Sequence, residues 1–191
     1  MDTVDIEKLN RDNFRSLQNT LAMPGSIHKV SPLFDSYLLA LANTLLYSQV
    51  SFHYEGEEEF DLVEAITNTK KEIPENADYI FCDQLNEYLF NKGKTGSSKD
   101  PEFSATYIFK CNDFSGLKVR LSGPGIDKEK EVELPIDKSF VEFFNEKNSY
   151  YPLGNEVFFL SKNGDLTAIS RTTKVEYIGC NSKCSSKVEV L

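Results

Sequence analysis

The chain has 191 residues, 40% of them hydrophobic and including 14 Phe and 9 Tyr, which is enough for one domain with a substantial core. Thirty acidic against 21 basic residues give a formal charge of −9, and the lysines are dispersed, so no nucleic-acid partner is expected. No run approaches the roughly 18 apolar residues of a membrane span, and the acidic start lacks a secretory pattern. We therefore expect a cytoplasmic protein without a membrane partner.

Helices and strands alternate in the first half of the sequence. Asp12 can cap an amphipathic helix that ends before Pro24, and Ser31 followed by Pro32 can cap a second helix that is apolar on almost every side. The patterns then predict a strand over residues 50–54, a helix over 60–66, a strand over 78–82 and a helix over 85–90. Such an order is typical of a sheet with helices packed against it.

Strands and turns dominate the second half. Residues 105–111 and 117–122 predict two strands joined by a turn, and Asp137 can cap a helix. Residues 156–161 and 166–170 predict a hairpin around Asn163 and Gly164, and another strand follows over 174–178. We therefore expect an α/β fold with a mixed sheet covered by helices on both faces. No linker divides the chain, which predicts one domain of residues 1–191, with a core over 12–176 and a tail over 177–191.

A cation and two hydroxyls follow the second strand of the hairpin. Arg171, Thr172 and Thr173 leave the predicted sheet together, and such a group can bind an anion. In the alternative interpretation, Arg171 pairs with a carboxylate and the threonines stand there because they favour β structure. The local sequence leaves both interpretations open.

A second candidate site ends the strand over 117–122. Gly123 and Gly125 would let backbone amides approach an anion without side-chain obstruction, and Arg120 lies on the polar face of the same strand. The alternative is an ordinary turn beside an exposed arginine. Arg15 on the first helix is a further candidate, with a solvated helix charge as its alternative.

Other motifs do not indicate catalysis, a metal or a cofactor. The stretch Gly93-Lys94-Thr95 resembles part of a phosphate-binding loop, but Tyr88 stands where that motif needs its first glycine. Cys180 and Cys184 have a spacing that a metal accepts, yet no second pair and no histidine accompanies them. No serine or cysteine has the local context of a nucleophile, and four cysteines are too few for a disulfide scaffold.

Six short segments occur together in a recognisable order. They are Phe14-Arg15-x-Leu17 with Met23-Pro24-Gly25; Ala77-Asp78-Tyr79; Gly96 with Pro101-Glu102 and Ala105-Thr106; Arg120-Leu121-Ser122-Gly123-Pro124-Gly125-Ile126; Tyr151-Pro152-Leu153-Gly154; and Arg171-Thr172-Thr173-Lys174-Val175-Glu176. In this order and at this spacing, the sequence resembles the PhnH family, over roughly residues 12–176. PhnH is a subunit of the bacterial carbon-phosphorus lyase system for phosphonate use.

The sequence departs from the family pattern at several positions. Ser170 replaces the proline that usually precedes the Arg-Thr-Thr segment, and Glu156 stands where the family tends to have aspartate. An acidic cluster expected after the second helix is replaced around Asn43 and Thr44. These departures leave the expected fold unchanged and fall next to the candidate ligand contacts.

The resemblance implies a three-layer α/β/α sandwich, similar to the large domain of pyridoxal-phosphate-dependent transferases but without their cofactor site. It also implies a homodimer that joins PhnG, PhnI and PhnJ in a core complex. Together with PhnL, the G, H and I subunits are implicated in forming α-D-ribose 1-methylphosphonate 5-triphosphate from ATP and methylphosphonate.

Two hypotheses follow from the resemblance. In the first, the chain is a structural or binding subunit that is not catalytic alone, because no nucleophile, base or metal set is assembled in the sequence. In the second, the chain itself binds a nucleotide or phosphonate, with Arg120, Arg171 and the amides of Gly123 and Gly125 holding phosphoryl oxygens. A pyridoxal-phosphate enzyme is a weaker third interpretation, since no lysine has a recognisable Schiff-base context.

Overall fold

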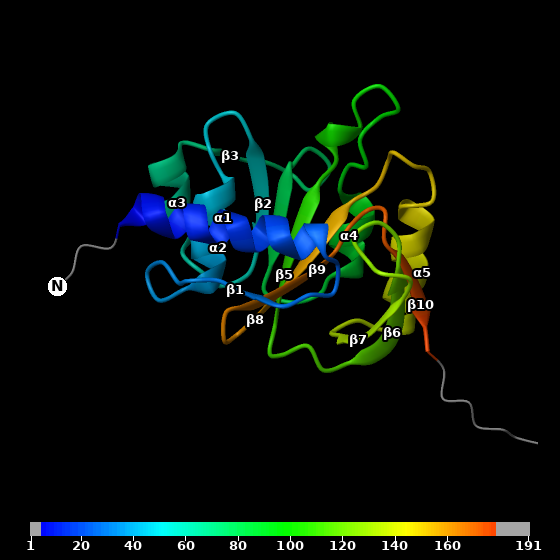
Figure 1. The fold of residues 1–191 in the computed structure, drawn as a ribbon. Coiled ribbons are helices and arrows are strands. Elements are labelled where there is room, and N and C mark those ends of the chain that lie inside the picture. The colour runs from blue at the N-terminus through cyan, green and yellow to red at the C-terminus, as the bar shows by residue number, and fades with distance from the viewer. Residues whose placement is uncertain (1–4, 179–191) are drawn as a thin grey trace, which may run out of the picture.

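The computed structural model describes residues 5–178 (Figure 1). Residues 179–191 of the predicted tail, with Cys180 and Cys184, lie outside the described residues. The helices are α1 (Ile6–Ala22), α2 (Tyr37–Leu45), α3 (Phe60–Thr67), α4 (Glu87–Lys92), a 3-10 turn (Pro101–Phe103) and α5 (Lys138–Lys147). The strands are β1 (His28–Lys29), β2 (Ser51–Glu55), β3 (Lys70–Lys71), β4 (Tyr79–Cys82), β5 (Thr106–Cys111), β6 (Leu117–Ser122), β7 (Lys130–Leu134), β8 (Glu156–Ser161), β9 (Asp165–Ile169) and β10 (Lys174–Tyr177).

Seven strands form one large mixed sheet in the order β1-β9-β8-β5-β4-β2-β3. Parallel pairing joins the five successive strands β3, β2, β4, β5 and β8. Strand β9 pairs antiparallel with β8 and with β1. The carboxyl ends of the parallel strands therefore lie along one edge, and their amino ends along the other. We call these the carboxyl edge and the amino edge of the large sheet.

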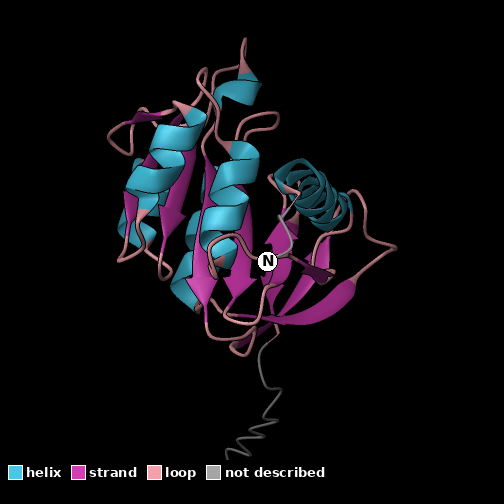
Figure 2. Ribbon diagram, turned by 90° about the vertical axis from the view of Figure 1, so that its left-hand side faces the viewer, coloured by secondary structure: helices cyan, strands magenta, loops and turns pink. Residues whose placement is uncertain are grey.

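Helices cover both faces of the large sheet. The apolar side chains alternate along each central strand, so that Phe81 faces the cluster formed with α1, α2 and α3, whereas Ile80 faces the cluster formed with α4 and α5. Phe158 and Phe159 divide in the same way. Figure 1 shows α1 crossing the sheet, and Figure 2 shows the strands between helices. The predicted α/β fold with a mixed sheet and helices on both faces is confirmed.

The predicted helix starts are wrong by several residues. The first helix begins after Asp5, whose carboxylate accepts a hydrogen bond from the backbone N–H of Lys8, so Asp12 lies inside the helix. The second helix is capped by Ser36 instead of Ser31. A tight turn with positive φ at Phe34 and Asp35 separates Pro32 from this cap.

A separate three-stranded antiparallel sheet, in the order β10-β6-β7, was not predicted. Its middle strand β6 leaves the turn after β5 without pairing to it, so the two predicted strands do not form a hairpin. Val119 and Leu121 of β6 face the core that also holds α5. The hairpin of β8 and β9 is confirmed, with Gly164 at a φ of 76° in its turn.

In residues 5–178, each helix is too short or too polar to cross a bilayer.

Candidate functional site

The small sheet brings the two candidate anion sites side by side. Strand β10 begins directly after the Arg171 to Thr173 turn, and its pairing with β6 places Lys174 opposite Ser122, next to Gly123. A groove of 620 Å³ lies where these segments meet the end of α5. Its lining residues are Pro124, Asn145, Asn148, Ser149, Tyr151, Arg171, Thr172, Thr173 and Lys174. We call this the Arg171 groove.

Arg171 is held by a carboxylate inside the protein. Its Nε lies 2.7 Å from Glu156 Oε1, and its backbone N–H donates to Glu156 Oε2 at 2.9 Å. Its Nη1 donates to the carbonyl oxygen of Pro101 at 2.9 Å. The side chains of Arg171 and Glu156 are only 22% and 16% exposed. The alternative interpretation, in which Arg171 pairs with a carboxylate, is therefore confirmed.

The two threonines close the turn that carries Arg171. Thr173 Oγ1 accepts a hydrogen bond from the backbone N–H of Ser170 at 3.1 Å, and the backbone N–H of Thr173 donates to the Ser170 carbonyl at 2.9 Å. The Ser170 hydroxyl lies within hydrogen-bonding distance of both threonine hydroxyls. Thr173 is buried, whereas Thr172 is partly exposed. These bonds fix the direction in which Arg171 leaves the sheet.

Gly123 and Gly125 allow close approach between parts of the chain itself. Both have positive φ, 129° and 82°. A Cβ atom at Gly123 would lie 2.7 Å from the carbonyl oxygen of Thr172, and one at Gly125 would lie 2.0 Å from the carbonyl oxygen of Ala22. The first glycine therefore lets β6 meet the Arg171 turn, and the second lets the same loop pack on the end of α1.

Arg120 is placed differently from Arg171. It lies on the outer face of the small sheet, opposite Glu131 on β7 and Glu176 on β10. Its Nη2 is 3.1 Å from Glu131, and its Nε is 3.2 Å from Glu129. These carboxylates raise the pKa of Arg120, and the hydrogen bond that Arg120 donates to Glu131 contributes most. Arg120 does not line the Arg171 groove, so the structure does not join the two arginines in one site.

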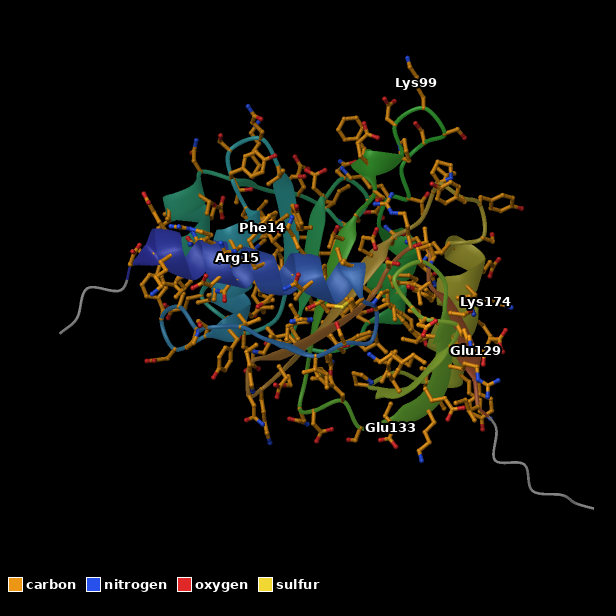
Figure 3. All side chains as sticks on the ribbon, viewed as in Figure 1. Phe14, Arg15, Lys99, Glu129, Glu133 and Lys174 are labelled. Carbon is orange, nitrogen blue, oxygen red and sulfur yellow. The ribbon has the colours of Figure 1, made fainter. Side chains whose placement is uncertain are left out.

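Arg15 lies apart from both candidate loops. It is on the exposed side of α1 and forms an ion pair of 3.5 Å with Asp12, one helical turn earlier. Figure 3 shows Arg15 and Phe14 on α1, away from Lys174 and Glu129 at the small sheet. The structure thus gives Arg15 the contacts of a solvated helix charge.

Six lining residues of the Arg171 groove were not among the candidate site residues of the sequence: Pro124, Asn145, Asn148, Ser149, Tyr151 and Lys174. Asn145 on α5 bonds both backbone groups of Val175, while the Asn148 side chain bonds both backbone groups of Asn155. Lys174 contacts Glu176 at 2.7 Å, and Tyr151 is exposed. One feature of the sequence could have indicated Asn145 and Asn148. They are three residues apart at the end of a predicted helix, so their side chains point to the same side.

The Arg171 groove therefore carries little net charge, and most of its polar side chains already bond other parts of the protein. Its two cations each contact a carboxylate, and its two asparagine amides hold neighbouring backbone segments. An incoming phosphoryl group would have to compete with Glu156 for Arg171. This geometry suits the positioning of surface loops better than the tight binding of a multiply charged anion.

The carboxyl edge carries a second polar cluster, which the sequence analysis missed. Lys110 at the end of β5 lies 2.5 Å from Glu58 and 3.5 Å from Asp83. Tyr54 donates its hydroxyl hydrogen to Asp83 at 3.0 Å, and Ser36 donates to Glu58. Hydrogen bonds and charges from the two carboxylates raise the pKa of Lys110 in spite of its burial. A cavity of 510 Å³ lies against this cluster, which we call the Lys110 network.

Lys147 is a buried amine without a carboxylate contact in the described chain. Its Nζ donates to the carbonyl oxygens of Phe90 and Gly93, at the end of α4, and lies 3.3 Å from the Tyr107 hydroxyl. Burial lowers the pKa of Lys147 to about 8. Burial also raises the pKa of Cys82 and Cys111 to about 12, so both thiols stay protonated. Between residues 5 and 178, no group of three metal-binding side chains is assembled.

The fold and these contacts define an α/β protein of the three-layer type, with a groove built from internally bonded loops. Residues 5–176 match the family described as bacterial phosphonate metabolism protein, PhnH. None of the curated proteins matches the chain. The family match covers nearly the whole sequence, and the chain therefore belongs to the PhnH family and to bacterial phosphonate metabolism.

Proposed function

We propose that this chain is a structural or binding subunit of the carbon-phosphorus lyase core complex. In this role it forms a homodimer in the cytoplasm and joins PhnG, PhnI and PhnJ. Its fold is that of the large domain of pyridoxal-phosphate-dependent transferases, without the cofactor. The complex forms α-D-ribose 1-methylphosphonate 5-triphosphate from ATP and methylphosphonate, and the chain supports this transfer without catalysing it alone. The family match over residues 5–176 is the observation that carries the proposal.

An aromatic surface at the amino edge supports a docking role. Tyr150 and Tyr151 are 77% and 80% exposed, and Phe103 is 60% exposed. Their loops meet, because the N–H of Gly154 donates to the carbonyl of Thr95 and Arg171 reaches the carbonyl of Pro101. Exposed aromatic side chains are enriched in the cores of protein interfaces. We call Phe103, Tyr150 and Tyr151 the aromatic surface.

Co-purification with the other subunits tests this role. We expect the wild-type chain to co-purify with PhnG, PhnI and PhnJ, and replacement of both Tyr150 and Tyr151 by Ser to weaken this association at least roughly tenfold, as loss of interface aromatics commonly does. Tyr88→Ser is the matched control, because Tyr88 is 67% exposed on α4, outside the aromatic surface. Failure of the wild-type chain to co-purify with the other subunits would refute the docking role.

A second function would use the Arg171 groove. The groove gathers Arg171, Thr172 and Thr173 over a volume of 620 Å³, which is within the usual range for small-molecule sites. In this alternative the chain binds ATP or a phosphonate there and contributes to the transfer site. Calorimetry with ATP and with methylphosphonate tests it, using the wild-type chain alone and in the complex. Arg171→Ala should abolish binding, whereas Arg120→Ala, outside the groove, should preserve it; absence of heat with the wild type would exclude this function.

A further inference from the structure

Three apolar side chains are exposed on α3 and on the turn before α2. Phe34 is 52% exposed, Leu62 42% and Ile66 53%. Phe34 and Leu62 both line the cavity of 510 Å³ beside the Lys110 network. Ile66 lies one helical turn beyond Leu62, on the same side of α3. We call Phe34, Leu62 and Ile66 the apolar strip.

The turn that presents Phe34 has an unfavourable backbone for this residue. Leu33 and Ser36 exchange two backbone hydrogen bonds of 3.0 Å, and φ is 52° at Phe34 and 60° at Asp35. Two-residue turns of this kind are usually formed by Asn, Asp or Gly, and a bulky residue with positive φ is an outlier. Leu33 is buried and Ser36 caps α2, so the turn is anchored on both sides. The fold therefore holds an aromatic side chain in solvent at a position where a smaller residue would fold more easily.

Unpaired carboxylates surround the apolar strip. Residues 55–64, EGEEEFDLVE, include no basic residue. Four exposed carboxylates form no ion pair within residues 5–178, namely those of Asp35, Glu57, Glu59 and Asp61. Among the described residues that line the cavity, the cations are Lys110 and Lys162, and Lys110 is already bonded to Glu58 and Asp83. The surface around the strip is therefore negatively charged.

This charge selects among the molecules that could cover the apolar strip. Nucleic acids and anionic lipid surfaces are repelled by unpaired carboxylates. An amphipathic helix with lysine or arginine beside its apolar stripe is complementary in both respects, because apolar side chains fill a groove and the flanking cations meet carboxylates. The apolar residues of such a helix recur every three or four positions, which suits a strip that continues along α3.

We propose that the apolar strip binds a basic amphipathic helix of a partner protein. An apolar side chain of that helix enters the cavity between Phe34 and Leu62, and the helix continues along α3 toward Ile66. Its cations meet the carboxylates of Glu57 and Glu59. Figure 1 shows α3 at the end of the molecule away from the small sheet. The strip is separate from the aromatic surface, so this interaction goes beyond the docking role.

A synthetic amphipathic peptide of leucine and lysine is the probe, added to the full chain. We expect it to shift the nuclear magnetic resonance amide signals of residues 34–36 and 57–66, and its affinity to fall with added salt. A peptide with glutamate in place of lysine, and one with serine in place of leucine, should each bind at least roughly tenfold more weakly. Absence of these shifts with the leucine and lysine peptide would refute the proposal. Equal binding of the serine peptide would reduce the interaction to unspecific charge attraction and would also refute it.

Variants of the apolar strip test where the peptide binds. Leu62→Ser should weaken binding roughly tenfold, as loss of an anchoring side chain commonly does. Ile73→Ser is the matched control, because Ile73 is 57% exposed outside the strip. Phe34→Asn should weaken binding similarly, while its melting temperature stays equal or rises, since asparagine adopts positive φ readily. Unchanged binding by both Leu62→Ser and Phe34→Asn would overturn the proposal.

A charge variant completes the test. Glu57→Gln combined with Glu59→Gln should weaken binding roughly fivefold and reduce its dependence on salt. Glu142→Gln, an exposed change on α5, should alter neither quantity. Equal effects of the two charge changes would show that only the net charge of the protein matters, which would overturn the assignment to this surface. Replacement of Tyr150 and Tyr151 by Ser should leave peptide binding unchanged, so the proposal and the docking role fail separately.

Discussion

The two edges of the large sheet differ in how their polar groups are satisfied. At the carboxyl edge, Lys110 meets Glu58 and Asp83, and those carboxylates in turn accept hydrogen bonds from Ser36 and Tyr54. At the amino edge, Ser104 Oγ and Asn155 Oδ1 are buried without partners in the described chain. The charged groups of the carboxyl edge therefore bond one another, whereas the amino edge leaves two buried oxygens without a bond in the described chain.

This contrast reverses the usual arrangement in open α/β sheets. Ligands of such proteins commonly bind at the carboxyl ends of the strands, where successive connections pass to opposite faces. Here that point lies between β2 and β4, because β2 leads to α3 on one face and β4 leads to α4 on the other. The Lys110 network lies at this point. Internal ion pairs thus occupy the place where a cofactor would bind in a related architecture.

Loss of Lys110 should give the largest change in stability. Lys110→Met would leave the carboxylates of Glu58 and Asp83 without their shared cation, and because two partly buried charges lose their partner at once, we expect a loss of about 2 kcal/mol of unfolding free energy. Urea unfolding followed by circular dichroism measures it. Lys162→Met is the control, since Lys162 lines the same cavity but is exposed. Equal stability of the two variants would show that the carboxyl edge is not held by its charges.

Lys147 should make stability depend on alkaline pH at the amino edge. Burial lowers its pKa from 10.5 to about 8 in the folded protein, so between these values the unfolded chain binds more protons. Folding stability contributed by Lys147 therefore rises as pH increases through this window. Between pH 7.5 and 9.5 we expect a gain of about 2 kcal/mol relative to Lys147→Met, from 1.36 kcal/mol per pKa unit.

Urea unfolding of both proteins at several pH values measures this difference. Subtracting the Lys147→Met curve removes the contribution of tyrosines, whose folded pKa is raised by burial. Lys92→Met, on the exposed part of α4, should leave the wild-type slope unchanged. Parallel curves for wild type and Lys147→Met would mean that the carbonyls of Phe90 and Gly93 offset the cost of burying the ammonium.

The Arg171 and Glu156 pair should show coupled effects. Arg171→Gln leaves Glu156 with only the backbone N–H of residue 171, and we expect a loss of about 1.5 kcal/mol. Adding Glu156→Gln should recover part of that loss, because the unpaired charge is then removed. Unfolding free energies of the single and double variants measure the coupling. Additive losses would show that the two side chains do not stabilise each other.

Periodic apolar patterns predicted the five central strands of the large sheet and the helices that cover it, but not the two-residue edge strands β1 and β3. The alternation of Ile80 with Phe81 and the apolar run of β8 identify strands that are buried on both faces. The small sheet was missed in part because β7 is a charged strand, KEVEL, with only Val132 and Leu134 facing inward. In its pairing with β6, Glu131 lies opposite Arg120 and Glu133 opposite Lys118, an arrangement that no local pattern reveals.

The candidate site was harder to predict, because each charged side chain is neutralised by a partner that lies far away in the sequence. Arg171, Thr172 and Thr173 were found as a cluster, but their neutral surroundings depend on Glu156, 15 residues away, and on the carbonyl of Pro101. The sequence predicts that Gly123 and Gly125 leave room for a ligand, whereas the carbonyl oxygens of Thr172 and Ala22 occupy that space. Ser104 has no distinctive local sequence at all, since its lack of a partner emerges only from the packed structure.

Arg120 provides the smallest expected effect and the sharpest comparison with Arg171. Both arginines contact carboxylates, but Arg120 is 38% exposed and its partners Glu129 and Glu131 are 58% and 64% exposed. Exposed ion pairs contribute little because water and salt screen them, so Arg120→Gln should leave the free energy of unfolding close to that of the wild type. Urea unfolding at low and high salt tests this, with Arg171→Gln measured alongside. A loss as large as that of Arg171→Gln would mean that the outer face of the small sheet is a stabilising charge network in its own right, and that burial does not distinguish the two arginines.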